Sequence, residues 1–377
     1  MTGRRLCPTL CLACWLCTGC GAPETPAQLQ AAPAPPQVAL LEISHPDPLA
    51  FKPEITASLA PALARFRTES TTLDGVDLGA AFGKLGLHYQ AHQQQEAAAA
   101  CFINAQRLDP TNHRWPYYLA VHEEETGEFD NAIANYKQSL ELVPDNVAGA
   151  TRLGLLILQL GDLEPAQRVL DDVIARQPNS AAALAGLADI AADRDDPQTA
   201  AQLYQQALSI DPQASQLYYR LGLTYRKLGD IERAKAALSQ RGERIPRIAD
   251  PLLVIMQAHL HPPAYYIDQA NAALEANDLR RSAQRLSLAL TVEPTHAQAL
   301  TQLGELLLAV KQDAAAKKQF EQLVQAHPDH ALGHYYLGLC AVRAGDKPTA
   351  TRHMREALKL EPGMERATKA LQRLTTG

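Results

Sequence analysis

Residues 82–110 read FGKLGLHYQAHQQQEAAAACFINAQRLDP, and this stretch decides the fold. Read at helical spacing, large residues such as Leu85 and Phe102 alternate with small ones such as Gly86 and Ala98. Glycine or alanine at a crossing lets two helix axes approach closely, and large side chains fill the hollows beside it. The proline at the end of the stretch stops the second helix. The pattern therefore predicts two short antiparallel helices joined by a tight turn.

The same pattern recurs along the chain. Its closing proline returns every 34 residues, at Pro110, Pro144, Pro178, Pro212 and Pro246, and after one interruption at Pro294, Pro328 and Pro362. The Leu-Gly pair of the first helix returns at Leu153-Gly154, Leu221-Gly222, Leu303-Gly304 and Leu337-Gly338. One such hairpin cannot bury its own apolar face, so we expect a stack of hairpins with a continuous core.

This pattern resembles the tetratricopeptide repeat (TPR) family, whose unit is a 34-residue helix-turn-helix. The resemblance covers residues 79–364 and implies an all-α, right-handed TPR solenoid of about eight repeats. We expect the following order: a signal peptide (1–20), a Pro/Ala-rich tether (21–50), an N-terminal capping helix region (51–78), repeats 1–5 (79–248), a 14-residue inserted helix (249–262), repeats 6–8 (263–364) and a C-terminal capping helix (365–377).

The first 20 residues have the pattern of an export signal, with Arg4-Arg5, an apolar run and then Thr18-Gly19-Cys20. The last three residues resemble the end of a bacterial lipobox, in which the cysteine is lipidated, although Cys17 stands where that pattern prefers an aliphatic residue. We expect an exported lipoprotein on the periplasmic side of the outer membrane, or a soluble periplasmic or secreted protein without lipidation at Cys20. A metal or iron–sulfur cluster on the cysteines of residues 7–20 is the less favoured alternative.

Two segments interrupt or flank the repeats. In the insertion, Asp250-Pro251 is a helix start, and the apolar run behind it predicts a helix buried between the two blocks of repeats. Residues 53–67 predict a capping helix, in one piece or in two because Pro61 lies inside it.

Composition and motifs argue against catalysis and nucleic-acid binding. The net charge is −6, whereas nucleic acid requires a basic face. No glycine-rich phosphate loop, His-Glu-x-x-His or Gly-x-Ser-x-Gly motif is present. His88 and His92 have a spacing that can hold zinc, but no further ligand completes the set, so we expect surface histidines. The histidines at 327, 330 and 334 straddle a turn between repeats, and a metal site there is the less favoured interpretation. We expect that the protein is not an enzyme and that it binds no metal and no cofactor.

The resemblance implies that the first helix of each repeat lines a concave groove. In this register the groove residues are Arg114, Tyr117, Val121, Glu124, Leu155, Leu158, Asp189, Asp193, Tyr219, Leu223, Arg226 and Lys227, followed by Asn271, Leu274, Glu305, Tyr335, Leu339 and Arg343. This mixture of aliphatic, tyrosine and charged side chains suits a peptide or an amphipathic helix.

We therefore predict a non-enzymatic protein-protein interaction scaffold at the bacterial cell envelope, assisting assembly of an envelope complex. Its partner would be a protein, and it would contact the membrane only through a lipid anchor. Two alternatives stay open: a metal- or cofactor-binding accessory subunit, and a regulatory TPR partner of a transferase.

Overall fold

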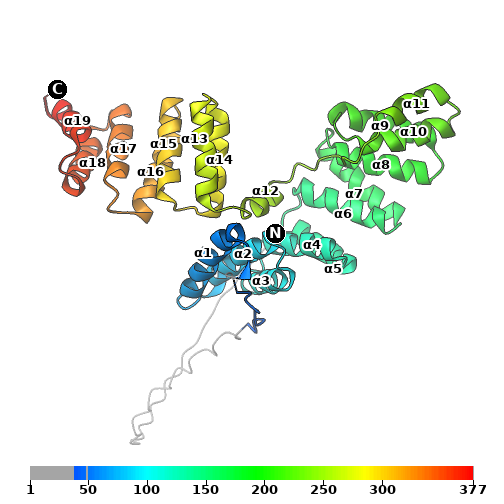
Figure 1. Cartoon of the computed structure of the whole chain (residues 1–377), viewed down its shortest axis with the longest axis horizontal. Helices are drawn as coiled ribbons and strands as arrows, with labels where there is room; N and C mark the ends of the chain where they lie inside the picture. Colours follow the sequence, from blue (N-terminus) through cyan, green and yellow to red (C-terminus); the bar gives the residue numbers. More distant parts are fainter. Residues whose placement is uncertain (1–37, 48–49, 377) are drawn as a thin grey trace, which may run out of the picture. The chain divides into compact units, whose positions relative to one another are not determined.

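Figure 1 shows a computed structural model of the chain, which describes residues 38–47 and 50–376. Contacts divide the chain into two units, Met1–Val38 and Ala39–Gly377, and the helices described below lie in the second. The predicted signal peptide, its cysteine Cys20 and most of the predicted tether fall outside the described residues.

The described residues form nineteen α-helices and no strands, so the predicted all-α class is confirmed. The helices are α1 (Pro53–Glu69), α2 (Gly75–Ala91), α3 (Gln95–Leu108), α4 (Arg114–Thr126), α5 (Phe129–Leu142), α6 (Val147–Gln159), α7 (Leu163–Arg176), α8 (Ala181–Asp193), α9 (Pro197–Ile210), α10 (Gln216–Lys227), α11 (Ile231–Ser239), α12 (Pro251–Ala258), α13 (Pro263–Glu275), α14 (Leu279–Val292), α15 (Ala297–Ala309), α16 (Asp313–Ala326), α17 (Ala331–Arg343), α18 (Lys347–Leu360) and α19 (Glu365–Thr376). None of these is both long and apolar enough to cross a membrane.

Most of the helices pack as consecutive hairpins, and within the first five and within the last three each hairpin packs on the next (Figure 1). The hairpins are α2–α3, α4–α5, α6–α7, α8–α9, α10–α11, α13–α14, α15–α16 and α17–α18. In seven of them the second helix ends two residues before the recurring proline, as at Leu108 before Pro110. The proline therefore ends one hairpin and allows the next to begin.

The helices of a hairpin approach closely where a glycine of the first faces a large side chain of the second. A Cβ added at Gly86 would lie 2.7 Å from Cε1 of Phe102, and one at Gly154 would lie 2.7 Å from Cδ2 of Leu170. Phe102 and Leu170 are both fully buried, so neither can swing away without opening a cavity. This contact explains why Leu-Gly recurs in the sequence.

The fifth hairpin departs from the predicted boundary at residue 248. Helix α11 ends at Ser239, and residues 240–250 run without regular structure to α12. Gly242 and Pro246 both disfavour a helix here, and the backbone of this stretch bonds to other parts of the protein instead. The predicted inserted helix is α12, but it is not buried all round, because Val254 is 51% exposed.

Both ends of the helical array are covered. Helix α1 runs unbroken through Pro61 and packs on α2. The last residues of the predicted tether also pack on the first hairpin rather than running free: the Leu41 backbone N–H donates to Asn104 Oδ1 (2.7 Å), and the Asn104 amide donates back to the Leu41 carbonyl oxygen (2.9 Å). At the other end, α19 packs on α18 and buries Ala367.

The close approach within a hairpin can be tested by adding one methyl group. Gly86→Ala places its Cβ against the buried Phe102 ring, so we expect the free energy of unfolding to fall by about 1–3 kcal/mol. Gly363→Ala is the matched control, because no atom lies within 4 Å of the added Cβ, and its effect should stay within about 0.5 kcal/mol. Urea unfolding followed by circular dichroism measures both. Equal stability of the two variants would contradict the packing described here.

Candidate functional site

The inner face of the hairpins, formed by α4, α6, α8 and α10, is the candidate functional site. It is crossed by the protein's own residues 240–262, which we call the crossing segment. The Gly242 backbone N–H donates to the Ser215 carbonyl oxygen (3.1 Å), and the Gln216 N–H donates to the Arg244 carbonyl oxygen (3.0 Å). The predicted groove is therefore partly filled by an extended piece of the same chain.

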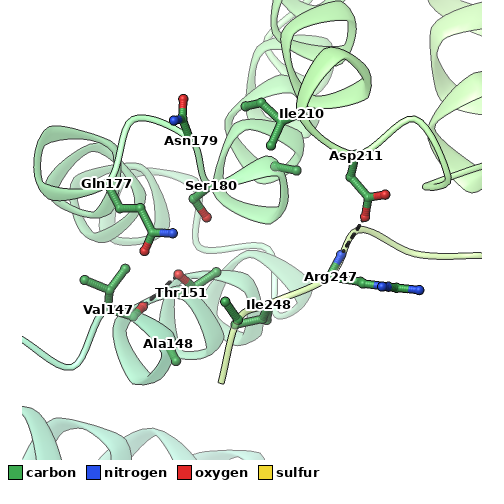
Figure 2. Close-up of a pocket in the computed structure, with 12 residues that line it drawn as sticks. Val147, Ala148, Thr151, Gln177, Asn179, Ser180, Ile210, Asp211, Arg247 and Ile248 are labelled. Atoms are coloured by element: carbon green, nitrogen blue, oxygen red, sulfur yellow. Dashed lines mark hydrogen bonds between the residues drawn. The ribbon is translucent and has the colours of Figure 1, made fainter. Parts of the chain in front are cut away.

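Figure 2 shows the crossing segment farther along, beside a cavity of about 290 Å³. The Arg247 backbone N–H donates to Asp211 Oδ2 (3.2 Å), while the guanidinium of Arg247 extends away from the cavity. Val147 and Thr151 of α6 line the opposite wall. Here Asp211, in the turn after α9, holds the segment through its backbone, so this contact does not depend on the side chain of Arg247.

Asp250 is the strongest anchor of the crossing segment. Its side chain is only 2% exposed, and it accepts hydrogen bonds from the Tyr117 hydroxyl and from Nε of Arg152 (3.1 Å). It also caps α12 by accepting the Leu253 backbone N–H (3.0 Å). A buried carboxylate needs such partners, because leaving it unpaired in the interior is costly. Burial, together with this carboxylate, raises the pKa of Tyr117 and keeps its hydroxyl as a donor.

Arg152 is held in place from its other side. Its Nη1 lies 3.4 Å from Glu124 Oε2, and the Tyr136 hydroxyl donates to the same carboxylate oxygen (2.5 Å). Glu124, Arg152 and Asp250 thus form a charged row between α4, α6 and the crossing segment. Arg152 thus bridges two carboxylates, and a further carboxylate from another segment would have to displace Asp250 to reach it, because the added negative charge would otherwise be repelled.

The far end of the crossing segment packs on the first helices. The Tyr118 hydroxyl donates to the Leu252 carbonyl oxygen (3.2 Å), and the Ser58 hydroxyl donates to the His259 carbonyl oxygen (3.0 Å). The rings of His259 and His88 meet edge to face, with centroids 4.6 Å apart. Helix α12 therefore sits on α2, and it also contacts α14 of the sixth hairpin.

The expectation of surface histidines at positions 88 and 92 was wrong. His88 and His92 are 7% and 9% exposed, and His88 packs directly against His259 beyond the end of α12. Burial, with His259, His92 and Arg65 adding to it, holds the pKa of His88 well below its usual value of 6.5. Burial also lowers the pKa of His259 to about 4. Among the described residues, no group of three or more His, Cys, Asp or Glu side chains is arranged to hold a metal ion.

The predicted groove residues fall into four sets. Tyr117 and Val121 are buried at 0% and 2% exposure, so neither is open to a partner in this structure. Glu124, Leu155 and Leu158 line cavities beside the crossing segment. The others that border a cavity lie between α8 and α10, around a space of about 240 Å³: Asp189, Asp193, Leu223 and Lys227.

The remaining predicted residues lie outside these cavities. Tyr219 is 49% exposed on α10, and the other members are Arg114, Arg226, Asn271, Leu274, Glu305, Tyr335, Leu339 and Arg343. Several of them already have partners. Arg343 pairs with Asp313 (2.6 Å), the Arg366 guanidinium lies over the Tyr335 ring, and Glu305 accepts a hydrogen bond from the Tyr336 hydroxyl.

Two arginines of the inner face were missed by the sequence analysis. Arg152 and Arg220 occupy the same repeat position, two repeats apart, and each pairs with a carboxylate on the inner face. Arg220 pairs with Asp189, which also accepts the Tyr204 hydroxyl. Burial raises the pKa of Asp189, while Arg220 and Tyr204 oppose that rise. The shared repeat position was the available signal, because a side chain at one position of each unit faces one side of the stack.

Helical hairpins that stack on one another, with their first helices along one inner face, define a helical-repeat protein. Two family models, both described as tetratricopeptide repeat, match the chain, one over residues 84–147, 151–215 and 314–365 and the other over residues 191–258. The chain therefore carries tetratricopeptide repeats, which confirms the predicted resemblance.

Similar proteins match only parts of the chain. Human Tetratricopeptide repeat protein 7A is 29% identical over 123 residues, which are 33% of this chain and 14% of that protein. BBSome complex member bbs-4 of Caenorhabditis elegans is 29% identical over 129 residues, 34% of this chain and 27% of that protein. The chain thus spans well under half of the length of either relative.

Among solved structures, MamA protein is 19% identical with a TM-score of 0.40, covering 43% of this chain and 88% of that one. YrrB, described as a TPR protein with an unusual peptide-binding site, is 16% identical with a TM-score of 0.25, covering 63% and 97%.

The buried histidines predict a pH-dependent stability. The folded-state pKa of His259 lies near 4, below its unfolded value of 6.5, so protonation favours the unfolded chain. The stability that the neutral, buried His259 contributes is complete above pH 6.5 and is lost as the pH falls toward 4. We expect the free energy of unfolding to drop by about 2 kcal/mol more between pH 7.5 and pH 5 in the wild type than in His259→Phe.

Urea unfolding at the two pH values measures this difference. His327→Gln is the control, because His327 binds the Thr295 carbonyl oxygen rather than α12, and its pH dependence should match that of the wild type. Identical pH dependence in wild type and His259→Phe would show that His259 is not buried as described.

Proposed function

We propose that this chain is a non-enzymatic scaffold that binds a peptide or helix of a partner protein on the inner face of its repeats. TPR proteins mediate protein-protein interactions, and the chain carries these repeats. The observation that supports this site is the crossing segment itself. The turn between α9 and α10, at the edge of the inner face, already binds extended backbone at Ser215 and Asp211, and this supports binding of a second chain on the same side.

The open part of this face lies between α8 and α10. Leu223 is half-buried there, with the charged side chains of Asp193 and Lys227 exposed beside it. An apolar centre with charges of both signs around it suits a protein segment, since the apolar contact contributes affinity and the charges set the orientation.

The proposed location is the bacterial cell envelope, where the scaffold would assist assembly of an envelope complex. This part of the proposal rests on the export-like pattern of residues 1–20 and on the lipobox-like Thr18-Gly19-Cys20. A lipid on Cys20 would tether the protein to the periplasmic side of the outer membrane; without the lipid, the protein would be soluble in the periplasm or secreted.

The anchor can be tested in cells. We expect the wild type to sediment with membranes and to incorporate labelled palmitate, and Cys20→Ser to lose both properties. The matched control is Cys7→Ser, which lies outside the lipobox-like pattern and should keep both. Incorporation of palmitate by Cys20→Ser would contradict lipidation at Cys20.

The binding face can be tested by site-specific photo-crosslinking in the host cell. A crosslinking amino acid at Leu223 should capture a defined partner, because this position lies in the open cavity of the inner face. The same amino acid at Gln206, exposed on α9, should capture nothing specific. Equal capture from both positions, or capture from Gln206 alone, would move the binding site off the inner face.

A further inference from the structure

The contacts of Asp250 and α12 indicate what kind of ligand the face of α4 and α6 accepts. Tyr117 and Arg152 present a hydroxyl donor and a fixed positive charge to one buried carboxylate. That carboxylate caps the helix that follows it, by accepting the Leu253 backbone N–H. The recognised unit is therefore an acidic residue placed directly before a short helix.

The helix that follows supplies the apolar part of the contact. Met256 is buried within the core of the first hairpins, and Leu252, Leu253 and Ile255 are half-buried against the same core. An eight-residue helix is unstable alone in water, so α12 depends on this surface for its structure. Docking and folding of α12 are then one event, as for a segment that folds on its partner.

The crossing segment does not fill this surface completely. A cavity of about 630 Å³ remains between α4, α6 and the segment, lined by Glu124, Arg152, Leu155 and Val254 among others. Ile245 and Val254 of the segment are 63% and 51% exposed, so part of its apolar surface stays in contact with water. A ligand that also covered these positions would bury more apolar surface than the crossing segment does.

We propose that the face of α4 and α6 is a docking surface for a partner segment in which an aspartate or glutamate caps a short apolar helix, and that residues 245–258 are its resident occupant. This proposal rests on the proposed function and adds the chemistry of the partner. Partner and resident segment compete for the same charge on Arg152, so binding of one releases the other.

A defined peptide tests this competition on the full chain. The probe is a fluorescent peptide with the sequence of residues 244–260, and its binding is measured by fluorescence anisotropy. Asp250→Asn weakens the resident segment, because Arg152 and Tyr117 lose their charged acceptor. We expect the peptide to bind this variant at least tenfold more tightly than it binds the wild type.

Three matched controls identify the contact. A peptide carrying asparagine in place of Asp250 should bind the Asp250→Asn chain at least tenfold more weakly than the parent peptide, and adding Arg152→Gln to the chain should remove this preference. Asp278→Asn, which alters the equivalent helix cap of α14 outside the inner face, should bind the peptide as the wild type does. Equal binding of the two peptides to the Asp250→Asn chain would overturn the proposal.

Hydrogen exchange on the wild type keeps the test decisive if the variant does not fold. Saturating peptide should speed exchange of the amides of 251–258, and unchanged exchange would overturn the proposal. If light scattering shows that the Asp250→Asn chain forms dimers and does not bind the peptide, the proposal is overturned. The occupant of the surface would then be residues 245–258 of a second copy of the chain. Loss of capture at Leu223 with intact peptide binding would instead count against the proposed function alone.

Discussion

The close contact of two helices within each hairpin is the constraint from which the rest of the structure follows. Gly86 against Phe102 and Gly154 against Leu170 leave no room for even one methyl group. Because the contact recurs at the same place in each unit, the hairpins can stack in one register, and the first helices of successive hairpins share one side. The inner face is the surface that this regular stacking creates.

That face has a strongly polar character where it meets the crossing segment. Asp250, Arg152 and Glu124 alternate in charge across it, and backbone groups of Ser215 and Gln216 bind the extended chain between α11 and α12. The stability of this arrangement depends on keeping each buried charge paired, because an unpaired one would cost several kcal/mol (about 3–5). The histidines at the far end have no such pairing with acids and instead stay neutral through burial.

Much of the fold could be predicted from the sequence, since it depends on contacts close along the chain. The 34-residue spacing from Pro110 to Pro144 indicates where the helices end, and the small residues Gly86 and Ala98 indicate where two helices cross. Both features lie within one repeat. The fifth hairpin ends earlier than predicted, at Ser239, where the chain leaves the repeat pattern.

The candidate site could not be predicted to the same depth. Asp250 reaches Tyr117 across 133 positions of the sequence, and no local pattern encodes that pairing. The burial of His88 has the same origin, because His259 and α12 cover it only after the chain has returned to the first hairpins. Asp250-Pro251 indicated a helix start, but it did not indicate that Arg152 and Tyr117 would bind the aspartate. Contacts of long sequence separation therefore account for the difference between the predicted empty groove and the occupied one.

The central claim is that the inner face binds an extended segment of polypeptide, and residue-resolved amide hydrogen exchange of the full chain tests it most directly. The Gly242 and Arg247 amides donate to the Ser215 carbonyl oxygen and to Asp211, so both should exchange at least tenfold more slowly than in a free peptide of residues 240–250. Exchange of both amides at the rate of the free peptide would show that the segment does not lie on the inner face.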